Sequence, residues 1–393
     1  MSEPGLDPFS ARSSEERHAI YARLRRESPV HRLPSGAWFV ASRSGVRTVL
    51  MNVERFVGSF GNRGDLPEEE TVIAAIPEPR HGLIRKILNS GLAFHHASKL
   101  EPFVRETAAR LLGQTVETAR KDGEAELCAS FTRPLPCAVI ARAIGIPDDD
   151  VDRFARWSDE LLTRQVDMGA SPKLGEVHHE FVDYVDAQVR ERAEATHPPR
   201  DLVTRLLETE VEGERLTRRA VRTQVLMLIL AGNETTRNLM GNLLWRLACD
   251  AELAARLRAE PAEVDVAIEE SLRLDTPVQF LVRTCTEALE IDGVKVDADD
   301  RVIVGVASAN RDEAVFEDPN AFDLDRPGLR DHVGFGAGPH ICPGAFLARM
   351  EARIGIQDFL AAVARIEPAP GYVLDANPVP WAFGPKTLRL SLG

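Results

Sequence analysis

The sequence GFGAGPHICPG at 334–344 is a glycine-rich turn that contains Cys342. It stands directly before AFLARMEARIGIQDFL at 345–360, where the apolar spacing predicts a helix. A turn that enters a helix N-terminus offers a thiolate positive potential and backbone donors, and the glycines let a flat or bulky group approach the backbone. Cys342 is therefore a candidate axial sulfur ligand of a haem; the alternative is a buried, unreactive cysteine in a turn.

The composition around this stretch is that of a packed globular protein. The 393 residues include 61 acidic and 48 basic side chains, and the net charge of -13 argues against general nucleic-acid binding. The longest apolar run, at 225–232, ends at Asn233 and falls short of the roughly 18 residues that a membrane span needs. The five cysteines form no C-x-x-C pair, which disfavours a zinc site. We expect a soluble, cytoplasmic protein without a membrane anchor.

Helical periodicity dominates the chain, and no linker long enough to separate independent domains interrupts it. Helices are expected over the following ranges: 15–26, 99–121, 149–164, 176–194, 217–249 and 262–274. Strand-like alternation is confined to short pieces that could build one small sheet: 37–41, 288–297, 301–308 and the C-terminal TLRLSL. Between about 309 and 345 turn-forming residues crowd a long segment without helical period, and such segments are usually functional.

The decapeptide FGAGPHICPG at 335–344 resembles the haem-binding signature F-G-x-G-x-H-x-C-x-G of the cytochrome P450 monooxygenases at every fixed position. The segment at 310–326 resembles the meander that precedes this signature in the family. The resemblance implies the cytochrome P450 fold, mainly α with a small β region, as a single haem domain over 1–393. It places a helix-rich haem core at about 77–393 and a smaller β-containing part at about 20–76. The implied cofactor is haem b, whose iron would take the Cys342 thiolate as axial ligand.

A second pair of motifs appears in the family's order. ESLR at 270–273 places an acid and a base at i and i+3, where they can pair on one helix face. It resembles the family's E-x-x-R, which implies that Glu270, Arg273 and Arg326 brace the cysteine loop structurally. HGLIR at 81–85 sets a histidine and an arginine one turn apart, and both can donate to anionic oxygens.

The resemblance of HGLIR to the family's H-x-x-x-R implies that these two side chains bind the haem propionates. With the matching positions elsewhere, it implies the following cofactor-binding residues besides Cys342: His81, Arg85, Arg283, His340, Phe335, Gly336, Ala231, Gly344 and Ala348. Pro343 directly after the cysteine removes one amide that could donate to sulfur and suits the first turn of the following helix.

The sequence AGNETT at 231–236 interrupts the apolar helix expected at 217–249. Buried polar residues cost stability, so this interruption needs a reason. A threonine hydroxyl can bond the preceding turn and loosen the helix, and Gly232 could let a flat group or a diatomic ligand approach; the alternative is a kink held by water. The segment resembles the family's A-G-x-(D/E)-T-T, which implies two catalytic residues beside the oxygen site: Thr235 as hydrogen-bond donor and Glu234 as proton gate.

By the same resemblance, apolar segments would line the substrate site. The expected contacts are Ile76, Met168, Leu228, Val278, Phe280, Leu281, Trp381, Ala382 and Phe383. Val72, Ile73 and Ala231 extend this set. Such walls suit a lipophilic small molecule: a steroid, terpenoid, fatty acid or macrolide-like compound would fit, with a preference for a ring system.

The resemblance implies a haem-thiolate monooxygenase that inserts one atom of O2 into a C–H bond, working as a monomer. Nothing after Cys342 resembles a flavin or iron–sulfur domain, so NAD(P)H-derived electrons would come from a separate ferredoxin and its reductase. Arg80, Arg85, Lys86 and Arg349 could form a basic docking patch. Two alternatives remain: a peroxide-driven peroxygenase or decarboxylase of the same fold, and a non-catalytic haem-binding sensor. The acid–alcohol pair favours the monooxygenase over both.

Overall fold

The computed structural model describes residues 6–11, 13–58, 66–92, 94–157, 160, 178–376 and 380–393. Within them the chain divides into two compact units. The first unit comprises Met1–Ser59, Glu269–Cys342 and Pro378–Phe383, and the second comprises Phe60–Ile268, Pro343–Asn377 and Gly384–Gly393. The mainly helical character with a small share of strand is confirmed.

The first unit is built on a five-stranded sheet with the order β1-β2-β10-β7-β3. Its strands are β1 Val30–Arg32, β2 Trp38–Val40, β10 Arg301–Val304, β7 Leu281–Cys285 and β3 Phe56–Gly58. Neighbouring strands run antiparallel except β10 and β2, which are parallel, with Ile303 opposite Phe39. The sheet therefore joins the N-terminal part of the chain to a segment that follows it by more than two hundred residues.

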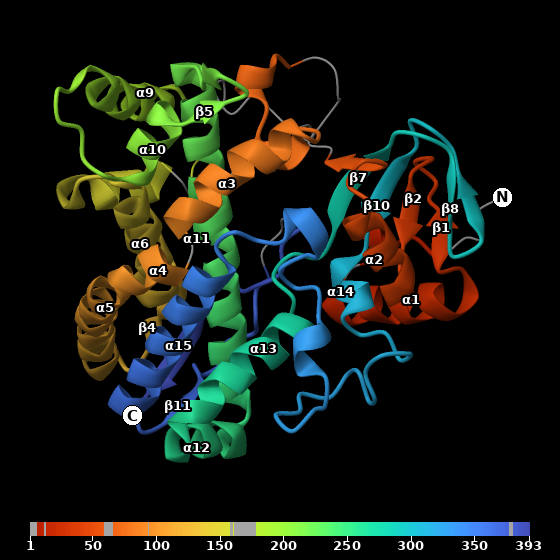
Figure 1. Ribbon diagram of the computed structural model, residues 1–393. Helices are drawn as coiled ribbons and strands as arrows, with labels where there is room; N and C mark the ends of the chain where they lie inside the picture. The colour runs from red at the N-terminus through yellow and green to blue at the C-terminus, as the bar shows by residue number, and fades with distance from the viewer. Residues whose placement is uncertain are drawn as a thin grey trace. The chain divides into compact units, whose positions relative to one another are not determined.

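Helices cover this sheet and complete the first unit (Figure 1). They are α1 Ser14–Glu27, α2 Arg43–Met51 and α14 Val306–Ala309, and β8 Leu289–Ile291 pairs with β9 Val294–Val296. Ser13 and Ser42 cap the two longer helices through side-chain oxygens that accept backbone N–H groups, as good N-caps do. The ring of Tyr21 on α1 stacks on the ring of Phe39 on β2, with the ring centroids 5.5 Å apart. Helix α1 therefore packs directly on the sheet.

The second unit is arranged around the long helix α11, Arg218–Cys249 (Figure 1). It contacts α6 Pro134–Ile144, α9 His179–Glu194 and α15 Ala345–Ala362. Because helices surround α11 over most of its length, its apolar residues are buried on several faces rather than in one stripe. Thr217 caps the helix by accepting the backbone N–H of Ala220.

Shorter elements fill the rest of the second unit. Its further helices are α3 Arg80–Leu92, α4 Phe94–Ala97, α5 Glu101–Asp122, α10 Leu202–Glu208 and α12 Ala251–Ala259. Its strands are β4 Ala125–Glu126, β11 Ile366–Pro368 and β12 Arg389–Leu392 in one sheet, and β5 Glu210–Val211 with β6 Glu214–Arg215 in another. Helix α13, Val264–Leu274, contains the boundary between the units.

Single tight turns connect these elements. The 3-10 turns are η1 Pro8–Ser10, η2 Glu68–Glu70, η3 Ile73–Ala75, η4 Ser98–Leu100, η6 Asp148–Asp150, η7 Pro261–Glu263, η8 Leu329–Asp331 and η9 Gly338–His340; η5, Cys128–Thr132, is a π turn. Between 310 and 344 the two short turns η8 and η9 are the regular elements, so the expected long irregular segment is confirmed.

The helical periods located the long helices well, and the strands less well. The helices expected at 99–121, 217–249 and 262–274 appear as α5, α11 and α13 within two residues at either end. Helix 149–164 lies partly outside the described residues, which show helix at 151–157. The strand expected at 301–308 was wrong in its second half, where α14 forms. The single small sheet was also wrong, because the predicted strands pair in three different sheets.

Candidate functional site

The loop that presents Cys342 is held in one conformation by its own backbone. Gly336 and Gly338 have φ values of 77° and 68°, in the left-handed region that L side chains rarely adopt. The Cys342 N–H donates to the Phe335 carbonyl at 2.9 Å, and the Ile341 N–H donates to Gly338 at 3.0 Å. A side chain at Gly338 would place its Cβ 2.7 Å from the Leu50 carbonyl oxygen. These glycines thus serve the turn and its packing on α2.

Side chains from two distant segments anchor the start of the loop. Asn310 accepts the Val333 N–H at 2.7 Å, and His332 accepts the Gly334 N–H at 3.0 Å. The other ring nitrogen of His332 lies 3.0 Å from a Glu269 carboxylate oxygen, which fixes the ring. These anchors were not predicted from the sequence. Glu269, directly before Glu270, was the available signal, but its partner His332 follows it by 63 residues.

The predicted bracing residues come together in the first unit. Glu270 and Arg273 form two hydrogen bonds of 2.7 Å, with both side chains fully buried, and Arg326 donates to Glu270 at 3.1 Å. Arg273 also donates to the carbonyls of Asn310 and Pro319, at 3.0 Å and 2.7 Å. The two arginines therefore satisfy backbone carbonyls of the segment 310–326 that leads to the cysteine loop, as expected of a structural brace.

Arg283 on β7 is a buried cation in the same unit. Its side chain donates to the Val282 carbonyl at 3.0 Å, and no ion pair among the described residues includes it. Burial lowers the pKa of its guanidinium to about 10, because the charged form loses its hydration. A carboxylate-bearing ligand such as a haem would supply the missing opposite charge, so this residue fits the predicted cofactor. His340 lies in η9, two residues before Cys342.

The structure joins two of the segments predicted to contact substrate. Val278 forms a β-bridge with Ala382, and the Gln279 N–H donates to the Trp381 carbonyl at 2.8 Å. Phe383 is tied in the same way to Pro277. The ring of Phe280, by contrast, packs edge-on against Phe9 at 5.1 Å, and Leu281 packs on the sheet core. Both side chains are thus half-buried and pack against the core of the first unit.

Helix α3 places His81 and Arg85 on one face in the second unit, one turn apart as expected. Both are buried, at 1% and 9% exposure. His81 Nδ1 lies 2.8 Å from a Glu78 carboxylate oxygen, and Arg85 Nε donates to Asn89 at 2.9 Å. Two buried basic side chains at this spacing can serve a pair of carboxylates, which fits the propionates of a haem.

The acid and the alcohol of α11 point to different partners. The Thr235 hydroxyl donates to the Ala231 carbonyl at 2.8 Å, as the sequence predicted for this helix. Glu234 is 2% exposed, and its carboxylate accepts from Arg237 at 3.0 Å and from Asn238 at 3.1 Å. Glu234 is thus held in an ion pair on its own helix, which the sequence analysis did not foresee although Arg237 stands three residues later.

Two expectations about α11 and α15 need correction. Helix α11 runs without interruption from Arg218 to Cys249, so the AGNETT segment does not loosen it. Gly232 faces α6, where an added Cβ would lie 3.0 Å from Ile140, so close helix packing explains this glycine. Helix α15 begins at Ala345 with Gly344 as N-cap, which puts Pro343 before the helix rather than in its first turn.

The other predicted contacts are divided between the two units. Ile76 and Leu228 are buried at 3% and 7%, whereas Ala231 is exposed. Gly344 and Ala348 lie at the start of α15, where the Ala348 N–H donates to the Gly344 carbonyl at 2.9 Å. Met168 lies outside the described residues. Phe335 and Gly336 belong to the cysteine loop of the first unit.

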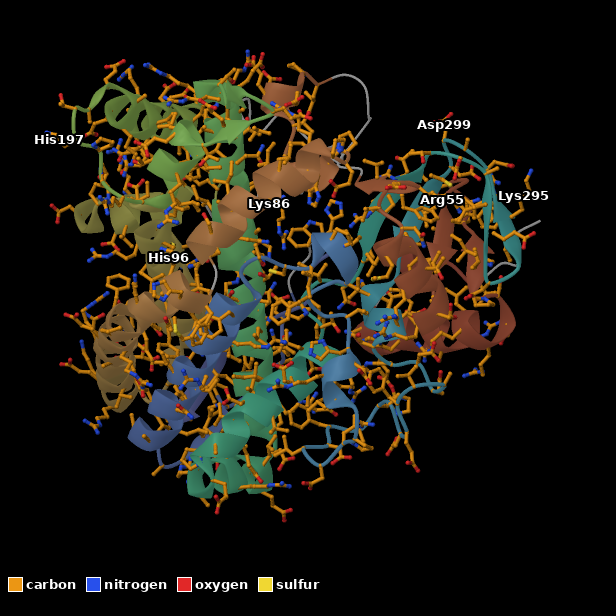
Figure 2. All side chains as sticks on the ribbon, in the orientation of Figure 1. Arg55, Lys86, His96, His197, Lys295 and Asp299 are labelled. Atoms are coloured by element: carbon orange, nitrogen blue, oxygen red, sulfur yellow. The ribbon has the colours of Figure 1, made fainter. Side chains whose placement is uncertain are left out.

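Two of the four side chains expected to form a basic docking patch for an electron donor are either paired with acids or buried. Arg80 is paired with Glu68 and, at 3.2 Å, with Glu212, and Arg85 is buried. Lys86 remains exposed on α3 (Figure 2). Arg349 is half-buried on α15. Acidic neighbours and burial thus leave Lys86 as the member of the four whose charge is fully at the surface.

Comparison with known proteins identifies the family to which the chain belongs. The sequence model of the family Cytochrome P450 matches residues 30–362. Cytochrome P450 109 of Bacillus spizizenii is 35% identical over 382 residues, which cover 95% of this chain and 91% of that protein. The cytochrome P450 monooxygenase PikC of Streptomyces venezuelae is 33% identical, covering 92% and 86%. The chain belongs to the cytochrome P450 family.

A solved structure gives the same result for the fold. The cytochrome P450 CYP109Q5 of Chondromyces apiculatus is 32% identical and superposes with a TM-score of 0.84, covering 95% of both chains. The protein is thus a haem-thiolate enzyme of the monooxygenase class, with haem b as its cofactor and a cysteine thiolate as the axial ligand. In the part of the chain that the structure describes, no helix is long and apolar enough to cross a membrane.

Proposed function

We propose that this monooxygenase inserts one atom of O2 into a C–H bond of a lipophilic, ring-containing small molecule. The observation that carries the proposal is the acid–alcohol pair of α11, where the Thr235 hydroxyl bonds the Ala231 carbonyl and the buried Glu234 carboxylate accepts from Arg237. A proton donor and a threonine at this position serve O2 chemistry and have no purpose in a mere haem carrier. The whole of 1–393 would work as one haem domain, with its core at about 77–393.

The proposed cofactor residues are those that the family resemblance implies. Cys342 is the proposed iron ligand, and Arg283, His340, His81 and Arg85 are the proposed propionate partners. Five smaller contacts would flank the macrocycle: Phe335, Gly336, Ala231, Gly344 and Ala348. When bound, a haem with thiolate ligation supplies the oxidising chemistry that cleaves the O–O bond.

The chain's own residues would control protons and water around that chemistry. Thr235 lies on α11 with a hydroxyl that is already oriented by its bond to Ala231. Glu234 would exchange its contact with Arg237 for ordered water and so pass protons toward the oxygen site. The surrounding apolar residues, Leu228 and Ile76 among them, would exclude bulk water and bind the substrate.

Structural relatives support a large lipophilic substrate. CYP109E1 of Bacillus megaterium has been solved with testosterone and with corticosterone, at 28% and 29% identity to this chain. A mutant of P450 EryK has been solved with erythromycin B, at 29% identity and a TM-score of 0.88. We propose a substrate of this size range, contacted by Ile76, Leu228, Val278, Trp381 and Phe383. Phe280, Leu281, Ala382 and Met168 complete the contact set proposed from the sequence.

The electrons would come from a separate ferredoxin and its reductase, as is typical of bacterial members of the family. Lys86 on α3 is the exposed cation that we propose for the donor's docking surface, with Arg349 as a second contact. Because the overall charge is -13, a local basic side chain would matter more for orienting an acidic partner than for attracting it from a distance.

The test combines spectroscopy with turnover. The reduced carbon monoxide complex should show the long-wavelength Soret band of thiolate ligation. A steroid and macrolide library should then identify compounds that displace the iron's water ligand, and these should be oxidised with ferredoxin, reductase, NAD(P)H and labelled O2. Incorporation of one labelled oxygen atom supports the proposal. Product with hydrogen peroxide alone would instead show a peroxygenase, and ligand binding without any product would show a sensor.

A further inference from the structure

A buried glutamine on α11, Gln224, forms hydrogen bonds with the backbone of the segment that contains η2 and η3. The Gln224 side chain is 1% exposed; its amide oxygen accepts the Ile73 N–H at 2.8 Å, and its amide nitrogen donates to the Thr71 carbonyl at 2.9 Å. A carboxamide offers a donor and an acceptor at once, so it can satisfy both backbone groups as a neighbouring strand would. We call residues 68–76 the clasped segment.

Gln224 lies on the face of α11 that carries the proposed substrate and oxygen residues. Leu228, Ala231 and Thr235 follow it at i+4, i+7 and i+11, positions that share one side of an α-helix. At 1.5 Å per residue, Gln224 is about 16 Å along the axis from Thr235. The clasped segment is therefore fixed at one end of a helix face whose other end holds the proposed oxygen-activating threonine.

Several other contacts also hold the clasped segment, and not all of them lie toward solvent: the Glu70 side chain, 10% exposed, pairs with Arg219 of α11. Glu68 pairs with Arg80, and Glu69 accepts from Thr217 at 3.0 Å and lies 3.4 Å from Arg219. The Thr223 hydroxyl adds a bond of 2.8 Å to the Glu69 carbonyl. Exposed ion pairs contribute little because water and salt screen them, whereas a buried backbone group that loses its partner is costly. Gln224 is the α11 side chain that bonds the two backbone groups next to the isoleucines, the Ile73 N–H and the Thr71 carbonyl.

We propose that Gln224 is a positioning residue for substrate selection, which holds Ile73 and Ile76 at a set distance from the face of α11. This inference rests on the proposed function, since it assigns the two isoleucines to the wall of the substrate site. Both are buried, at 8% and 3% exposure, directly beyond the two clasped backbone groups. Without the carboxamide, the Ile73 N–H and the Thr71 carbonyl must move to find other partners, and the apolar wall moves with them.

The experiment compares Gln224→Met with Gln357→Met. Methionine keeps the length of the side chain and removes both hydrogen bonds. Gln357 on α15 also bonds a backbone carbonyl, that of Pro261 in η7 at 2.8 Å, but is only half-buried, so its variant controls for the loss of a glutamine. The probes are two azoles that ligate the haem iron and are read by the Soret shift: imidazole, which is small, and clotrimazole, whose triaryl group reaches far from the iron.

We expect Gln224→Met to raise the Kd of clotrimazole by about tenfold or more and to leave that of imidazole within about twofold of wild type. Hydrogen exchange should speed up in the peptide that contains Thr71 and Ile73 and stay unchanged in the peptide that contains Cys342. Gln357→Met should match wild type in all readouts. If the methionine variant is not recovered with haem, Gln224→Asn, which is too short to reach both groups, should give the same selective loss.

Wild-type clotrimazole affinity in either Gln224 variant would overturn the proposal, and so would an equal loss for both azoles, because that pattern indicates a general structural defect. The azoles report on the iron and its surroundings whatever the natural substrate is. A wild-type protein that binds both azoles but oxidises no steroid or macrolide would therefore contradict the proposed substrate class and still decide the role of Gln224.

Discussion

The cysteine loop and the helix α11 hold their functional groups in different ways. The segment before the loop is fixed by fully buried charges, with Glu270 shared between Arg273 and Arg326 and each arginine also bound to carbonyls. On α11, Thr235 and Glu234 depend on bonds within their own helix, and the clasped segment depends on Gln224 and on ion pairs near the surface. A network of hydrogen bonds thus fixes the segment before the cysteine loop. On α11, single substitutions can alter the position of each functional group.

Two buried glutamates, Glu270 and Glu351, differ in the same way in the hydrogen-bond donors that surround their carboxylates. Glu270 receives hydrogen bonds from both arginines and from the Asp323 N–H. Glu351 on α15 is 3% exposed, and its Oε2 finds no hydrogen-bond donor among the described residues. Burial raises the pKa of Glu351 well above its usual range, because nothing compensates the lost hydration of the carboxylate. The carboxylate of Glu270 thus lies within a network of donors, whereas burial favours the protonated form of Glu351.

The largest effect is expected from Glu270→Gln. The variant leaves two buried guanidinium groups facing a neutral amide, and breaking a buried ion pair in this way costs about 3–5 kcal/mol. The free energy of unfolding in urea and the fraction of protein that shows the reduced carbon monoxide band should both fall. Glu27→Gln, which breaks the half-exposed pair with Arg23 at 3.0 Å, is the control and should change neither. Normal haem loading in Glu270→Gln would show that the brace is dispensable.

On α11, Thr235→Ala should leave folding intact and reduce coupling. Product formed per NAD(P)H should fall by about tenfold, less than the full effect of a positioned proton donor because water can replace the hydroxyl. The measurement is the ratio of product to hydrogen peroxide. Thr115→Ala removes a hydroxyl with the same bond to the preceding turn, at 2.9 Å on α5, and serves as control. Equal coupling in the two variants would remove Thr235 from the proposed proton path.

A pH-dependent effect is expected from Glu351→Gln. The folded protein holds the Glu351 proton more tightly than the unfolded chain, so unfolding releases a proton between the ordinary glutamate pKa of 4.5 and the raised folded value. Stability should fall as pH rises through that window, by about 1 kcal/mol per pH unit for one proton. Glutamine removes this dependence.

The measurement is the free energy of unfolding of both proteins across the pH range. The advantage of the glutamine variant should be absent below pH 4.5 and grow as the pH rises. Parallel curves for variant and wild type would show that Glu351 is compensated in the folded protein, and the contrast with Glu270 would then disappear.

The smallest effect compares two helical glycines. Gly232→Ala would put a methyl group 3.0 Å from Ile140 of α6, and we expect a loss of about 1 kcal/mol in the free energy of unfolding. Gly113→Ala on α5, where nothing lies within 4 Å, should instead gain up to about 1 kcal/mol from helix propensity. A gain in both variants would show that α6 yields, and Gly232 would then need another explanation.

The local parts of the site were predictable because their residues are close together in the sequence. The i, i+3 pair of Glu270 and Arg273 and the i, i+4 bond of Thr235 to Ala231 follow from helix geometry alone. The ion pair of Glu234 with Arg237 was not predicted, although the two residues are only three positions apart. The family pattern assigns the acid to the oxygen site and says nothing of this arginine. The Asn310, His332 and Glu269 anchors could not be read from spacing, since they depend on how the long irregular segment folds back.

The sequence alone was enough to predict the class of cofactor, the long helices and a glycine-rich turn at the cysteine. The helices follow from the apolar period, the turn from its glycines, and the cofactor class from the family signature around Cys342, all of which are local in the sequence. Only the tertiary structure decided which strands share a sheet, why Gly232 is a glycine and which backbone groups Gln224 satisfies. Those outcomes depend on packing between residues far apart in the chain, which no local pattern specifies.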